Sequence, residues 1–134
     1  MNNSTNPGFA QKFYQNLGKL FYAVAASDKV VKMEEIDTLK NIVEQEWVSI
    51  DDYQDEFGTD TAYQIEIIFD WLEENQPDAF LAFEEFSEFK KEHEKLFNSN
   101  INKLILKTAD AIAASYAGKN KSELIMLSKL KSIL

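Results

Sequence analysis

The stretch LGKLFYAVAASDKVVKMEEIDTLKNI, residues 17–42, decides the fold because a stretch of the same design returns 88 positions later. The second copy reads ILKTADAIAASYAGKNKSELIMLSKL and covers residues 105–130. Each copy has apolar residues at helical spacing, an Ala-Ala-Ser ending, a short turn, and a glutamate at the start of a second apolar stripe. The repeat therefore predicts two helical hairpins that pack as a pseudo-symmetric pair.

Helical periodicity continues on both sides of the two copies. We expect Pro7 at the first position of the first helix, after a capping Asn6, and Gly18 where a neighbouring helix comes close. His93, the single histidine, falls on an apolar stripe and is expected in the core or in an interface. The expected helices cover residues 7–26, 33–47, 61–75, 77–97, 101–117 and 122–134.

These elements define the fold class. No segment alternates convincingly with period two, and two prolines and four glycines supply little turn chemistry for an all-β chain. The prediction is an all-α fold: a single-domain, compact bundle of about six to seven helices with two pseudo-repeated hairpins, spanning residues 7–134. Residues 1–6 are expected to form a disordered N-terminal segment.

The composition of the 134 residues argues against several classes of function. Cysteine is absent, which rules out disulfides, zinc–thiolate sites and a cysteine nucleophile. A single histidine without cysteine leaves no convincing catalytic triad, and the four glycines form no phosphate-binding loop, so we expect no enzyme. No apolar run approaches the ~20 residues of a membrane span, and the start of the chain lacks signal-peptide features. We therefore expect a cytoplasmic protein.

The net charge of −9 is concentrated in the middle of the chain. Residues 34–94 hold 20 acidic residues and three lysines, whereas the two flanking segments are positive, at +3 and +5. The acidic middle repels phosphate and the chain has no arginine, so we expect no nucleic-acid binding. The segregation fits either a well-solvated acidic face or a docking face for a basic protein partner.

Two motifs within the copies carry a family resemblance. Residues 24–35, VAASDKVVKMEE, and residues 111–123, AIAASYAGKNKSE, resemble the signature of TerB-like domains, named for tellurite-resistance proteins. The resemblance implies a compact helical bundle without established catalytic activity, linked to tellurite and other stress responses, often through complexes near the membrane. It also implies metal binding by acidic residues. The chain departs from the signature at Lys29, where the family has glycine, and at Tyr116, where a second aspartate would stand.

Asp28 and Glu35, seven positions apart across the first turn, are the candidate metal ligands. Divalent cations such as Ca²⁺ or Mg²⁺ prefer several oxygen ligands, so these carboxylates with backbone carbonyls would form a weak site. In the alternative interpretation Asp28 bonds the amides of its turn and Glu35 stabilises the start of the second helix. We expect no cofactor other than such a divalent cation.

A second acidic cluster precedes the third expected helix. It is a candidate interaction face for a basic partner, and the alternatives are a solvated loop or a cation site. The cluster consists of Asp51, Asp52, Asp55 and Glu56.

Aromatic residues surround this acidic cluster in the sequence. Exposed aromatics beside acids suit a protein interface, whereas core filling is the alternative. The leading hypothesis is thus a TerB-like domain that binds a protein partner, with divalent metal binding as the alternative. The aromatic residues are Trp47, Tyr53, Phe57 and Trp71.

Overall fold

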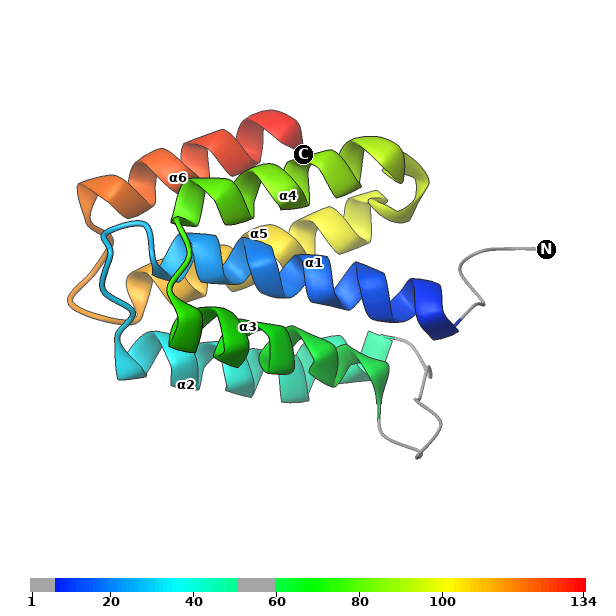
Figure 1. Cartoon of the computed structure of the whole chain (residues 1–134), viewed down its shortest axis with the longest axis horizontal. Helices are drawn as coiled ribbons and strands as arrows, with labels where there is room; N and C mark the ends of the chain where they lie inside the picture. Colours follow the sequence, from blue (N-terminus) through cyan, green and yellow to red (C-terminus); the bar gives the residue numbers. More distant parts are fainter. Residues whose placement is uncertain (1–6, 51–59) are drawn as a thin grey trace.

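The computed structural model describes residues 7–50 and 60–134, and every element in these ranges is helical. Figure 1 shows a bundle of six α-helices, so the all-α prediction is confirmed. Short 3₁₀ or π segments extend several of them. The α-helices are α1 (Pro7–Ala25), α2 (Met33–Ile42), α3 (Gln64–Asn75), α4 (Ala79–Glu92), α5 (Ser99–Ala114) and α6 (Lys121–Ile133).

Helix α1 is the centre of the bundle. It contacts α3, α4, α5 and α6, and in Figure 1 it runs through the middle with α4 and α6 above it and α2 and α3 below. Residues 20–25 are buried on all sides of the helix, since Tyr22 and Ala23 are as inaccessible as Leu20, Phe21 and Val24. A helix that is apolar all round belongs inside a protein.

Gly18 lies where α1 and α3 approach most closely. A Cβ atom at this position would be 2.8 Å from the carbonyl oxygen of Ile65 and 3.0 Å from the side chain of Ile68. The predicted close approach at Gly18 is confirmed, and its partner is α3.

Helix α2 continues into a π-helical turn, Val43–Trp47, and a 3₁₀ turn, Val48–Ile50. The helical segment expected over residues 33–47 is therefore present, although its last part is wider than an α-helix. Trp47 is fully buried and its indole Nε1–H donates to Thr108 Oγ1 of α5 at 3.0 Å. This bond satisfies a polar group that would otherwise be costly to bury.

The helix expected over residues 77–97 is interrupted, which corrects the prediction. Helix α4 ends at Glu92, His93 leaves the helical conformation (φ −136°, ψ 45°), and a 3₁₀ turn covers Glu94–Leu96. His93 is half-buried, with its ring centroid 4.9 Å from that of Phe9 and 4.5 Å from that of Phe89. The break lets the ring pack between α1 and α4 while the polypeptide turns towards α5.

Asparagine side chains set the starts of the last two helices. Asn98 Oδ1 accepts from Ile101 N at 2.9 Å, and Asn120 Oδ1 accepts from Glu123 N at 2.9 Å. These caps begin α5 two residues earlier than predicted, and α6 one residue earlier. Helix α5 also ends three residues before its predicted limit, at Ala114.

In the part of the chain that the structure describes, no helix is both long enough and apolar enough to cross a membrane.

Candidate functional site

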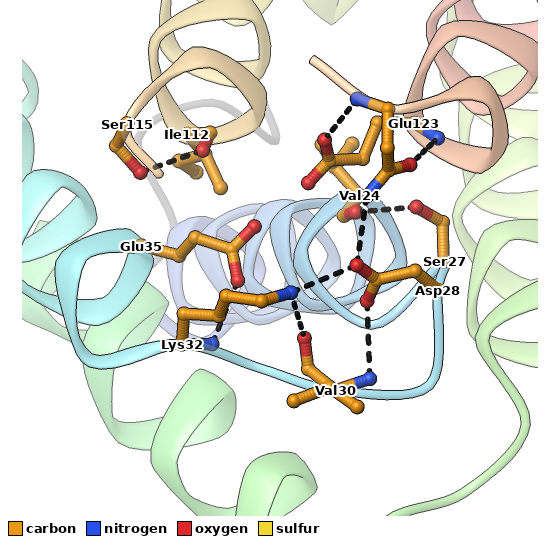
Figure 2. A network of polar contacts seen from close by, with 10 residues as sticks. Val24, Ser27, Asp28, Val30, Lys32, Glu35, Ile112, Ser115 and Glu123 are labelled. Atoms are coloured by element: carbon orange, nitrogen blue, oxygen red, sulfur yellow. Dashed lines mark hydrogen bonds and ion pairs between the residues drawn. The ribbon is translucent and has the colours of Figure 1, made fainter. Parts of the chain in front are cut away.

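The two turns of the repeat meet at one end of the bundle. They cover residues 26–32 and 115–120, and Figure 1 shows both at the left-hand end. Equivalent residues make equivalent bonds: Ser27 Oγ donates to Val24 O at 2.9 Å, and Ser115 Oγ donates to Ile112 O at 2.8 Å. The sequence repeat is therefore also a repeat of hydrogen bonds (Figure 2).

Glu35 and Glu123, the repeated glutamates, begin the second helix of each hairpin in the same way. Glu35 Oε1 accepts from Lys32 N at 2.7 Å, and Glu123 Oε1 accepts from Asn120 N at 2.9 Å. A glutamate that reaches back to the residue before a helix satisfies a backbone donor that the helix cannot. Both side chains are buried, with 1% of Glu35 and 2% of Glu123 exposed.

The carboxyl groups of Glu35 and Glu123 lie near each other, each at the start of its helix. Burial, and then the neighbouring Glu123 carboxyl, raise the pKa of Glu35 to about 8. The backbone N–H and the ammonium of Lys32 oppose this shift without cancelling it. Glu35 is therefore protonated at neutral pH.

Asp28 joins the two copies. Its carboxylate accepts from Val30 N at 3.1 Å, from Lys32 Nζ at 2.8 Å and from Asn120 Nδ2 at 2.7 Å. Burial opposes ionisation of Asp28, but these donors outweigh it and hold its pKa below the usual range. The bond from Asn120 crosses from the second turn to the first, so Asp28 fixes one turn against the other.

The structure thus brings both candidate metal ligands, Asp28 and Glu35, into one cluster that already contains a cation. Lys32 Nζ bonds Asp28 and, more weakly, Val30 O at 3.3 Å, and its charge also acts on the two glutamates. Its hydrogen bond to Asp28 raises the pKa of the Lys32 ammonium. Among the residues that the structure describes, no three His, Cys, Asp or Glu side chains gather as a metal site. These contacts favour the interpretation in which Asp28 and Glu35 hold the turn and the helix start.

Lys29 and Tyr116, the two positions that depart from the TerB-like signature, both lie in the turns described above. The ring of Tyr116 lies 5.3 Å from Lys32 Nζ, which is a cation–π distance, so the residue in the second aspartate position contacts the cation of the first copy. Lys29 and Ala117, 88 positions apart, both adopt left-handed backbone conformations, with φ of 71° and 52°. The turns thus share a conformation that favours glycine, the family's residue at Lys29.

The predicted interaction face, Asp51, Asp52, Asp55 and Glu56, lies outside the described residues, as do Tyr53 and Phe57. Of the two remaining aromatic residues, Trp47 fills the core and Trp71 is 58% exposed on α3. The structure thus decides between core filling and a protein interface for these two residues. Of the two, only Trp71 can serve an interface.

Further acidic residues lie on α3, α4 and the turn between them, and sequence reasoning located them only as part of the acidic middle. Of these nine carboxylates, two form ion pairs within the described residues: Asp70 with Lys40 at 3.3 Å and Glu85 with Lys19 at 3.2 Å. The same segment exposes four large apolar side chains. The acids are Glu66, Asp70, Glu73, Glu74, Asp78, Glu84, Glu85, Glu88 and Glu92, and the apolar residues are Ile67, Trp71, Phe80 and Leu81.

No family model, curated protein or solved structure matches the chain.

Proposed function

We propose that this chain is a non-catalytic, TerB-like helical domain that acts by binding a protein partner, in a stress response of the tellurite type or in an envelope-associated complex. The repeated motif and its turn support the family assignment. One observation carries the binding role: the exposed apolar side chains and largely unpaired carboxylates of α3 and α4.

The polar groups of the cluster between the turns satisfy one another, so the cluster can be explained without a ligand. Asp28 is bonded by three donors, Lys32 supplies the positive charge, and the two glutamates accept backbone N–H groups at the starts of their helices. This supports a structural role for the cluster, which leaves the surface as the better place for function.

The surface of α3 and α4 has the two properties that a partner with a basic face requires. Uncompensated carboxylates attract such a partner over long distances and set its orientation. Exposed Trp71 and Leu81 then offer large apolar side chains that the partner can bury, and aromatic anchors of this kind dominate many interfaces.

Affinity capture from native lysate tests this proposal. We expect the wild-type chain to retain a basic protein at low salt and to release it at high salt, because screening weakens contacts between exposed charges. The combined variant Glu74→Gln, Glu84→Gln and Glu88→Gln loses the partner. A second variant neutralises Asp51, Asp52, Asp55 and Glu56 and tests the part that this loop contributes.

The matched control carries Glu34→Gln, Asp37→Asn and Glu44→Gln, three exposed acids of α2 and the turn after it. It changes the net charge by the same amount and should keep the partner. Loss of the partner from test and control alike would show attraction by net charge alone, and the absence of any salt-sensitive partner would refute the proposal.

A further inference from the structure

A cavity of about 430 Å³ lies at the end of the bundle where the repeat turns meet. Its walls come from the turn after α1, from the C-terminal end of α3 and from the N-terminal end of α4. The floor consists of the buried residues Tyr22, Ala26 and Ala79, and half-exposed Val30 and Phe80 stand on opposite walls. Its volume is within the range of small-ligand sites, and its lining is polar and apolar in about equal measure.

Two carboxylates belong to the polar part of this lining. Asp78 uses Oδ1 to cap α4, accepting from Phe80 N at 2.7 Å, and Glu73 stands in the last turn of α3. Neither carboxylate forms an ion pair within the described residues. Both carboxylates also act on Tyr22 at the cavity floor. Burial is the largest cause that raises the pKa of Tyr22, and the negative charges of Glu73 and then Asp78 raise it further.

The end of α3 adds to this negative potential. The helix stops at Asn75, and Gln76 in a left-handed conformation (φ 53°) turns the chain along the cavity wall. The C-terminal carbonyls of α3 carry partial negative charge, which favours a cation nearby, whereas the N-terminal end of α4 carries partial positive charge that the capping Asp78 carboxylate offsets. Lys29 is the one basic residue among those described around the cavity; it is exposed and belongs to the turn after α1.

We propose that this cavity receives a lysine or arginine side chain of the protein partner. The apolar side chains of the cavity contact the methylene stem of the incoming residue, as apolar surfaces commonly do for lysine and arginine. Glu73 and Asp78 hold its charged head. This inference rests on the proposed function and specifies the partner's chemistry at one point of the acidic surface.

The polar cluster between the turns holds one wall of this cavity in place. Ala26, Ser27 and residues 29–31 line the cavity, while Asp28 between them is tied to Lys32 and Asn120. The repeat turns thus give the cavity a rigid wall before any partner binds, which reduces the entropic cost of binding.

The test uses NMR titration of the isotope-labelled full chain with blocked single amino acids. N-acetyl-lysine methylamide and its arginine analogue should shift the amide signals of Ala26, Val30 and Ala79. The norleucine analogue, which has an apolar side chain, and the glutamate analogue should shift them far less at equal concentration. Equal shifts with norleucine would show an apolar cavity only, and stronger shifts with glutamate would show that Lys29 dominates; either result overturns the proposal.

Two variants complete the test. Glu73→Gln with Asp78→Asn should weaken lysine binding by about tenfold or more, and the asparagine still caps α4. Glu34→Gln with Glu44→Gln removes the same charge from exposed positions outside the cavity and should leave lysine binding within about twofold of the wild type. Equal weakening by both pairs, or no shift of cavity signals with the wild type, overturns the proposal.

The two proposals fail in different ways. If the analogues do not bind but the partner is captured, the cavity assignment fails while the proposed function stands. If the analogues bind but no salt-sensitive partner exists, the cavity is a cation site and the proposed function fails.

Discussion

Glu35 is the residue whose chemistry depends most on the fold. In an unfolded chain its pKa is close to 4.5, whereas in the folded protein burial and the Glu123 carboxyl raise it to about 8. Between these values the folded state binds more protons than the unfolded state, so the stabilisation that depends on protonated Glu35 is complete below pH 4.5 and is lost as the pH rises towards 8. The loss is on the order of a few kcal/mol.

We therefore predict that the free energy of unfolding falls between pH 5 and pH 8, and that Glu35→Gln flattens this fall. The glutamine amide can still accept from Lys32 N and carries no charge to bury, so the variant should be more stable than the wild type at pH 8. Denaturant unfolding followed by circular dichroism at several pH values measures this.

Other groups affect the same profile in known directions. Burial raises the pKa of Glu66, which leaves some slope in the variant, whereas Asp28, with its lowered pKa, acts at more acidic pH. Glu34→Gln, at an exposed position beside Glu35, is the matched control and should keep the wild-type slope. A Glu35→Gln profile as steep as that of the wild type would refute the raised pKa of Glu35.

At the scale of elements, amphipathic periodicity predicted the helices well because it records which side chains are buried. All six expected helices are present, and Gly18 marks a real contact between α1 and α3. The break at His93 escaped prediction because the aromatic stripe continues past it, while the packing of its ring against Phe9 is a tertiary contact.

We predict that Gly18→Ala destabilises the protein although alanine favours helices by about 1 kcal/mol over glycine. The new methyl group would collide with a backbone carbonyl of α3, which cannot move without displacing the helix. The expected net loss is about 1–3 kcal/mol in thermal or denaturant unfolding.

Gln11→Ala, at an exposed position of the same helix, is the control and should be neutral or slightly stabilising. A Gly18→Ala variant as stable as the wild type would show that α1 and α3 are not held at this distance.

At the scale of the whole molecule, the repeat over 88 positions predicted that two similar turns exist and aligned Glu35 with Glu123. It could not show that the two carboxyl groups meet, or that Lys32 supplies the cation between the turns, because these contacts depend on how the hairpins pack. The charge run likewise located the acidic middle, but the exposure of Trp71 and Leu81 required the structure.

Site-specific photo-crosslinking in cells tests the central claim, that the chain binds a basic partner through α3 and α4, most directly. A benzophenone amino acid replaces Trp71 or Leu81 in the test chains and Lys103, exposed on α5, in the control. The account predicts a covalent adduct with one basic protein from positions 71 or 81 and none from position 103. The same adducts from position 103, or none from either test position in a folded and expressed chain, would contradict it.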